Sequence, residues 1–319
     1  MAAFDPHSNV PAVTRSQLML EMTYELIRDP KWRANQARIS LRQAGGHKPW
    51  EFCFFGSDAP PAIDEVARGE VHMAIINPAE PLALAERGVG PFAEPIPLRI
   101  VTIIPSADQM VFAIDPKAGI SSFEEIKARK FPLRYSMRAR PDHSTRFMVR
   151  ELFGALGFTM EDIEQWGGGL RQQQGYPSDV GQVARGEVDA VFDEGASNWV
   201  PAALDAGLRV LPIEGALATR LEAMGFRIAP LSKAEYPQLA ADVPTLDFSG
   251  WPLYTRADTA DDIVRACCAA IEACKDRVPW QGFGPLPLER MCIDGPDTPL
   301  TVPLHPAAEQ FWRERGYLS

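Results

Sequence analysis

Hydrophobic residues along the chain form short continuous runs, separated by longer stretches in which they recur every three or four positions. The short runs predict β-strands, and the longer periodicity predicts amphipathic helices. We expect strands at 37–43, 51–55, 99–105, 109–114, 133–137, 208–213 and 251–256. We expect helices at 16–28, 143–157 and 306–318, and another from Asp258 or Asp261 to about residue 277. Strands that alternate with helices indicate an α/β fold with mainly parallel sheets.

Local signals predict where several of these elements begin or end. Ser16 is the expected N-cap of the helix at 16–28, and Ser122 and Glu125 have the spacing of a capping box. Residues 214–250 are rich in Pro and Gly, so we expect irregular structure there.

One hexapeptide, VARGEV, occurs twice, at 66–71 and at 183–188. Each copy follows a predicted helix, turns at its glycine and leads into a short apolar run. The first run stops at Asn77 and the second at Asp193 and Glu194. The same unit of helix, turn and buried strand is therefore expected twice. Two such units predict two sheets whose polar strand ends face a shared crevice, as in a two-lobed clamp.

Size and charge narrow the class of protein. A chain of 319 residues suggests two domains or one large α/β unit. The 32 Lys and Arg residues against 42 Asp and Glu give a net charge of −10, which argues against nucleic-acid and anionic-membrane partners. No apolar stretch approaches the ~18–20 residues that span a bilayer, so direct membrane insertion is not expected.

The N-terminal segment and the number of cysteines give expectations for the cellular compartment of the protein. The segment has no basic region followed by an apolar one, which predicts a cytoplasmic protein, or a periplasmic one where a leader has been removed. An odd number of cysteines, five, agrees with a reducing compartment. Cys267, Cys268 and Cys274 share one helical run and are expected as small core-facing residues. Paired-cysteine zinc spacing and the common hydrolase motifs are absent, so we expect no metal and no cofactor.

Two polar strand ends of the first half are candidates for the crevice. Gly56 and Ser57 follow the strand at 51–55, where a turn could present backbone N–H groups to an anion. The alternative is an ordinary turn in which Ser57 or Asp58 caps the next helix. Asn77 is the counterpart after the first repeat, with helix capping after a proline turn as its alternative.

The start of the helix at 143–157 is the clearest candidate for binding an anion. His143, Ser144 and Thr145 open this helix, whose N–H groups and positive dipole end could hold a carboxylate. Simple capping by Asp142 or Ser144 is the alternative.

Three arginines lie near this helix start. Arg138, Arg140 and Arg146 could pair with an anionic ligand in bidentate fashion. Their alternative is a solvated surface position.

The strand end of the second repeat supplies the remaining candidates. Adjacent carboxylates on a strand point to opposite faces, so only one of Asp193 and Glu194 is expected to enter the crevice. Glu194 could accept a hydrogen bond from a ligand amine or hydroxyl. Asn198 and Trp199 follow it; Trp199 could stack on a ligand ring or pack in the core.

Four segments resemble one known family, the solute-binding proteins of TRAP transporters of the TAXI type, which have the type-II periplasmic-binding-protein fold. They are VARGEVHMAII with VARGEVDAVF, PDHSTRFMVRELFGALGF, VFDEGASNWVPAALDAGLRVLPI, and TRADTADDIVRACCAAI with PLHPAAEQFWRERGYL. The resemblance covers about 37–319, and the last pair is the most specific. The signal peptide and the first glycine-rich strand and loop of the family are not matched.

The resemblance implies a two-lobed type-II periplasmic-binding-protein-like clamp. Lobe 1 is expected at 1–107 plus 254–319 and lobe 2 at 108–253, with a ligand cleft between them. The expected function is binding of a small organic anion, a carboxylate above all, with transporter membrane subunits as partners where the protein is exported. Two alternatives stay open: a cytoplasmic decarboxylase or lyase that uses His143 and Glu194 as acid and base, and a ligand sensor.

Overall fold

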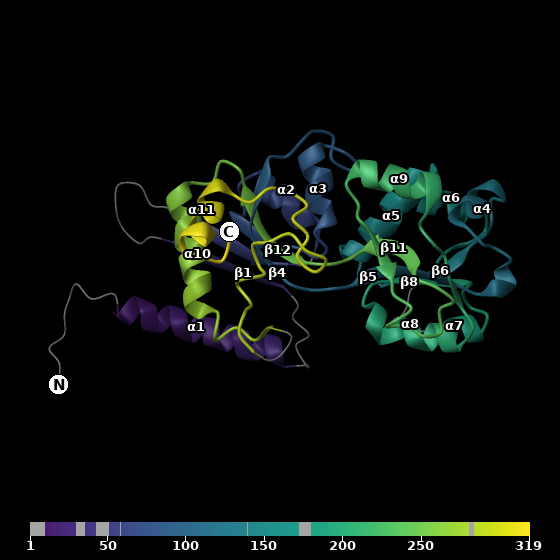
Figure 1. The fold of residues 1–319 in the computed structure, drawn as a ribbon, viewed down its shortest axis with the longest axis horizontal. Helices are drawn as coiled ribbons and strands as arrows, with labels where there is room; N and C mark the ends of the chain where they lie inside the picture. The colour runs from purple at the N-terminus through teal and green to yellow at the C-terminus, as the bar shows by residue number, and fades with distance from the viewer. Residues whose placement is uncertain are drawn as a thin grey trace.

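The computed structural model describes residues 10–29, 36–42, 51–57, 59–138, 140–171, 180–280 and 284–319. Figure 1 shows two lobes side by side along the longest axis, each built around one β-sheet. The described strands before residue 105 and after residue 250 belong to lobe 1, and the described strands between them form lobe 2. The expected two-lobed α/β fold is confirmed.

Lobe 1 contains a five-stranded sheet in the order β1-β2-β3-β12-β4. The strands are β1 (Ala37–Arg42), β2 (Glu51–Gly56), β3 (Met73–Ile75), β12 (Trp251–Arg256) and β4 (Leu98–Ile104). The helices are α1 (Val10–Arg28), α2 (Pro61–Ala67), α3 (Glu80–Arg87), α10 (Asp261–Cys274) and α11 (Pro306–Glu314). Two hydrophobic clusters form its core. One contains Ile63 of α2 and Tyr254, and the other contains Val264 of α10 and Trp312 of α11.

Lobe 2 contains a seven-stranded sheet in the order β10-β11-β5-β8-β6-β7, with β9 paired to β5. The strands are β5 (Gln109–Ile114), β6 (Arg134–Ser136), β7 (Gly169–Leu170), β8 (Ala190–Asp193), β9 (Arg209–Val210), β10 (Ile228–Leu231) and β11 (Val243–Asp247). The helices are α4 (Phe123–Ala128), α5 (Ser144–Leu156), α6 (Met160–Gln165), α7 (Gly181–Ala184), α8 (Ala196–Asp205) and α9 (Gly215–Met224), with a short 3₁₀ turn at Pro116–Ala118.

The prediction of mainly parallel sheets is wrong, because both sheets are mixed. Among the described strands, β2 with β3, β6 with β7 and β6 with β8 are the pairs that run in parallel. β12 and β5, the strands that follow a crossing between the lobes, run opposite to these parallel strands. β12 pairs antiparallel with β3 and β4, and β5 pairs antiparallel with β8, β9 and β11. Helical crossovers enforce parallel pairing only where they connect neighbouring strands.

Two segments cross between the lobes, 105–108 and 248–250, and they are hydrogen-bonded to each other. The Gly250 N–H donates to the Ser106 carbonyl at 2.8 Å, and the Phe248 N–H donates to the Asp108 carbonyl at 2.9 Å. The expected boundary between residues 253 and 254 falls inside β12, which belongs to lobe 1 as a whole.

The repeated hexapeptide forms the same structure in each lobe. Gly69 and Gly186 both adopt the left-handed conformation, with φ of 74° and 70°. The side chain at the start of the following strand accepts a backbone N–H from the neighbouring parallel strand in both cases. His72 Nδ1 accepts from Cys53 at 3.0 Å, and Asp189 Oδ2 accepts from Arg134 at 2.9 Å. The expected repeated unit is confirmed.

Three local expectations are corrected. Residues 214–250 are not irregular throughout but form α9, β10 and β11. Ser16 lies inside α1, which begins at Val10. Glu125 accepts from the Ser121 N–H at 2.9 Å and from its hydroxyl at 2.6 Å, so Ser121 replaces Ser122 as its partner. Among the described helices, none has both the length and the apolar character needed to cross a membrane.

Candidate functional site

A cavity of about 460 Å³ lies between the two lobes. Lobe 1 contributes residues from the start of α2 and the loop after α3: Pro60, Pro61, Asp64, Pro91 and Phe92. Lobe 2 contributes residues around α5 and the start of α6: Pro141, Asp142, His143, Arg146, Phe147, Arg150, Met160 and Glu161. Its volume falls within the ~300–1,000 Å³ of small-molecule pockets.

The positive charge of this cavity is gathered on α5. Arg146 and Arg150 lie one turn apart on this helix, so both face the cavity. Arg150 Nε also lies 3.0 Å from Glu151 Oε1. Asp64, Asp142 and Glu161 line the same cavity, so its two arginines lie beside three acids, of which Asp142 pairs with Arg140.

His143 is the N-cap of α5, where capping by Asp142 or Ser144 was the expected alternative. Its Nδ1 accepts the Thr145 backbone N–H at 3.1 Å, and the Thr145 hydroxyl donates to Asp193 Oδ1 at 3.3 Å. Ser144 and Thr145 are fully buried. The Thr145 N–H, one of the groups expected to hold a carboxylate, is therefore taken by the histidine.

A buried polar cluster lies behind this helix start, at the carboxyl ends of the parallel strands β6 and β8. Arg138 follows β6 and forms ion pairs with Glu194 and with Asp193, the latter at 3.5 Å. His143 Nε2 lies 3.4 Å from Arg138 Nη1 and 4.0 Å from Glu194 Oε1. Because its Nδ1 accepts a hydrogen bond, a neutral His143 carries its proton on Nε2.

Glu194 holds its proton more tightly than an ordinary carboxylate. Burial raises the pKa of Glu194 to about 8, with Asp108 and Asp193 adding to the shift and Arg138 opposing it. Asp193 and Glu194 share the guanidinium of Arg138, so ionisation of both would leave net negative charge in this buried cluster.

Asp108 connects the cluster to the first crossing segment. Its carboxylate accepts the backbone N–H groups of Gly195 at 2.7 Å and Ala196 at 3.0 Å, at the start of α8. It also shares a hydrogen bond with the Glu194 side chain. Sequence reasoning missed this residue, although an acid at an expected lobe boundary was a usable signal.

The candidates from lobe 1 form hydrogen bonds within the protein: Asn77 with a segment that crosses between the lobes, and Ser57 within a turn. Asn77 donates both hydrogens of its side-chain amide to the second crossing, to the carbonyls of Phe248 at 3.1 Å and Gly250 at 3.0 Å. Gly56 ends β2, and the Ser57 hydroxyl accepts the Ala59 N–H at 3.1 Å. That bond fits the interpretation of Ser57 as a turn residue before α2.

The remaining candidates, Trp199, Asn198 and Arg140, lie in three different environments. Trp199 is 2% exposed and packs in a lobe 2 core cluster, and its indole N–H donates to the Glu194 carbonyl at 3.0 Å. Ring stacking on a ligand is therefore wrong for Trp199, and core packing is confirmed. Asn198 is exposed on the first turn of α8. Arg140 Nε pairs with Asp142 Oδ1 at 2.9 Å.

The structure thus brings together two layers of residues. The cavity is lined by His143 and Arg146 of the predicted set, and by Arg150, Asp64 and Phe92, which sequence reasoning missed. The buried cluster lies beneath, with His143 common to both. Within the described ranges, no three His, Cys, Asp or Glu side chains are grouped as metal ligands would be.

Comparison with known proteins gives a family and distant structural likenesses. A family model described as the NMT1-like family matches residues 59–316. No curated protein matches the chain. Similar solved structures include the alkanesulfonate-binding protein SsuA of Xanthomonas axonopodis pv. citri bound to MOPS, at 14% identity and a TM-score of 0.30, with 67% of this chain and 61% of that chain covered.

Two further structures show likeness of the same order. An ancestral arginine-binding protein bound to arginine is 11% identical with a TM-score of 0.33, and the match covers 69% of this chain and 72% of that one. A protein of R. palustris with adipate is 14% identical with a TM-score of 0.30, and the match covers 66% of each chain. The chain therefore spans less than two thirds of SsuA and of the adipate-bound protein.

Proposed function

The chain belongs to the NMT1-like family, and from its geometry we propose that it binds a small organic anion in the cleft between its lobes, as a solute-binding protein does. The observation that carries the proposal is the inter-lobe cavity of about 460 Å³, with Arg146 and Arg150 one turn apart on its wall. Two guanidinium groups on one face suit a carboxylate or a similar planar anion.

Binding without chemistry fits the way the polar cluster is used. The Thr145 N–H occupies one nitrogen of His143, and Arg138 and Asp108 contact the Glu194 side chain. These contacts hold both residues in fixed positions within lobe 2. They support a rigid wall for a ligand that contacts the lobe 1 residues Pro91 and Phe92 when the lobes close on it.

A second candidate is an enzyme on the same fold. Glu194 has a pKa of about 8, and its Oε1 lies 4.0 Å from His143 Nε2. A protonated acid beside an imidazole supports proton transfer to a bound acid, as a decarboxylase or lyase requires.

One experiment separates the two candidates. Excess protein is incubated with a panel of small carboxylic acids, sulfonates and their uncharged amides, and mass spectrometry measures the retained and free fractions. An acid that is retained and recovered unchanged supports binding. A new product mass supports the enzyme, and retention of uncharged amides as well as acids overturns the anion proposal.

We propose the TAXI group of TRAP solute-binding proteins as the finer assignment, on the segments that resemble it. Its partners would be the membrane subunits of a transporter and its compartment the periplasm. The alternative is a cytoplasmic sensor that signals lobe closure. Fractionation of the native cells, followed by co-purification with membrane proteins in the presence of a bound acid, tests the assignment. A cytoplasmic location would overturn it.

A further inference from the structure

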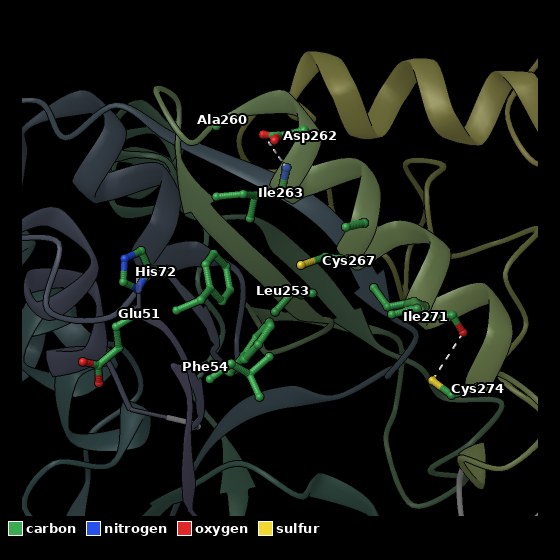
Figure 2. A pocket seen from close by; sticks show the side chains of 14 residues that line it. Glu51, Phe54, His72, Leu253, Ala260, Asp262, Ile263, Cys267, Ile271 and Cys274 are labelled. Atoms are coloured by element: carbon green, nitrogen blue, oxygen red, sulfur yellow. Dashed lines mark hydrogen bonds between the residues drawn. The ribbon is translucent and has the colours of Figure 1, made fainter. Parts of the chain in front are cut away.

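An open apolar groove lies on the outer side of lobe 1, away from the inter-lobe cavity. It has a volume of about 910 Å³ and lies between α10 and the strands β1 and β2 (Figure 2). Its apolar lining includes Leu41, Phe54, Leu253, Ile263, Ala270 and Ile271. Leu41 is 45% exposed, so the groove leaves large apolar surface in water.

The helix α1 carries a matching apolar surface. From Thr14 to Arg28 every residue except Thr23 is exposed. Seven of these are large hydrophobic residues that are 40–60% exposed: Leu18, Met19, Leu20, Met22, Tyr24, Leu26 and Ile27. A helix gains most of its stability in a protein from packing, so this surface calls for a partner.

The apolar residues of α1 form two stripes rather than one. Leu18, Met22 and Leu26 follow each other at intervals of four residues and form the first stripe, with Met19 at its edge. Leu20, Tyr24 and Ile27 form the second stripe, on another face of the helix. Glu21 and Glu25 lie between them. Docking into one groove buries one stripe only, so the second stripe needs another apolar surface.

We propose that the protein forms a two-fold dimer in which α1 of each copy lies in the groove of the other. The first stripe fills the groove, and the second stripes of the two α1 helices pack against each other. Both apolar surfaces are covered by one symmetric contact.

The charges agree with this arrangement. Arg15 precedes Leu18 by three residues and Met22 by seven, so it lies within the first stripe. The formally charged residues that line the groove are both acidic, Glu51 and Asp262, and Glu51 pairs with Arg42 of β1. Arg15 within the docking face of α1 therefore meets the Asp262 carboxylate at the groove, whereas Glu21 and Glu25 stay outside the contact.

The oligomeric state of the full chain gives the first test. Light scattering is expected to give twice the monomer mass of 35.2 kDa. Leu18→Asp with Met22→Asp on α1, and Ala270→Arg in the groove, should each give monomers. Glu21→Gln is the matched control and should stay dimeric. Ala270 is exposed, so its substitution leaves the core intact, and circular dichroism checks the fold of each variant.

A second measurement identifies which copy fills the groove. Cys274 lines the groove, and its alkylation should be about tenfold slower in the dimer than in the Leu18→Asp/Met22→Asp variant. Chains with Leu18→Cys, Cys267→Ala and Cys274→Ala are then mixed with tagged wild-type chains. Oxidation should yield a disulfide between the two kinds of chain.

Three results overturn the proposal. A monomer with protected Cys274 means that α1 lies in its own groove. A monomer with rapidly alkylated Cys274 means that nothing covers it. A monomer that floats with vesicles of neutral and anionic phospholipids, and loses this binding with Leu18→Asp/Met22→Asp, assigns α1 to a membrane surface instead.

Discussion

Asp108 accepts the backbone N–H of Gly195 at 2.7 Å, across 87 positions of sequence. Asp108 belongs to the first crossing segment between the lobes, and Gly195 precedes the first turn of α8. The same carboxylate contacts the Glu194 side chain. The hinge and the buried cluster beneath the cleft are therefore joined through one side chain.

Replacement of Asp108 by Asn should destabilise the protein. The amide that replaces the carboxylate would keep one oxygen for the two N–H groups of α8 and would lose the charge that favours a helix N-terminus. We expect a loss of about 1–2 kcal/mol in the free energy of unfolding, measured by urea denaturation. Asp276→Asn is the control, because Asp276 is exposed and its pair with Lys275 lies at the surface. Equal effects of the two variants would mean that Asp108 does not cap α8.

The pH dependence of stability should change in Glu194→Gln. The pKa of Glu194 is raised from 4.5 to about 8 by burial, so the folded protein binds more protons than the unfolded chain between these values. Stability from this group is fully present below about pH 4.5 and is lost as the pH rises through about 8. The variant should therefore lose less stability than the wild type between pH 5 and pH 9. Parallel stability curves would show that Glu194 titrates normally.

Glu80 is a second carboxyl group whose pKa is raised by burial. Its side chain is fully buried on the first turn of α3, and neither carboxyl oxygen has a hydrogen-bond partner on another residue of the described chain. Burial, with Asp247 adding to it, raises the pKa of Glu80 well above its usual value. Glu80→Gln should raise the melting temperature at pH 8 and change it little at pH 4.5, since the wild type is neutral there. A lower melting temperature at pH 8 would refute this.

The fold followed from the sequence where short-range signals decide it. The repeat around Gly69 and Gly186 placed the same turn and strand in both lobes, because a left-handed glycine and a buried run are local features. The strands β10 and β11 escaped prediction, since Pro230 faces Pro244 and only the pairing of β11 with β5 joins them to the sheet. The direction of each strand could not be predicted either, because the pattern of apolar residues is the same for parallel and antiparallel pairing.

The sequence predicted where the candidate site lies in the fold, but not which side chains line it. Polar residues after β6 and β8 marked the right edge of the sheet, and His143 does line the cavity. Which side chains of a helix face the cavity depends on how the helix is rotated about its axis when it packs against the sheet. Trp199 shows this, since α8 directs its ring into the core. Arg150 was missed because it lies in the middle of α5, and an arginine at such a position has no local sequence signal that separates it from a solvent-exposed one.

Removal of the Asn77 side chain should weaken the hinge. Its amide satisfies two carbonyls of the second crossing, and a buried unsatisfied polar group costs about 1–3 kcal/mol. Asn77→Ala should therefore destabilise the protein by about 2–4 kcal/mol in urea denaturation. Asn198→Ala, at an exposed position of α8, is the control and should change stability by less than about 0.5 kcal/mol. A similar small effect at Asn77 would show that water replaces its two hydrogen bonds.

The two arginines of α5 should determine affinity for an acid that the panel experiment retains. Arg146→Gln and Arg150→Gln each remove a charged donor from the cavity wall, and a charge-assisted hydrogen bond is worth about 1.5–3 kcal/mol. We expect each variant to weaken binding about tenfold to a hundredfold in calorimetry, with an unchanged melting temperature. Arg220→Gln, at an exposed position of α9 that does not line the cavity, should bind as the wild type does. Wild-type affinity in both α5 variants would exclude the cavity between the lobes as the binding site.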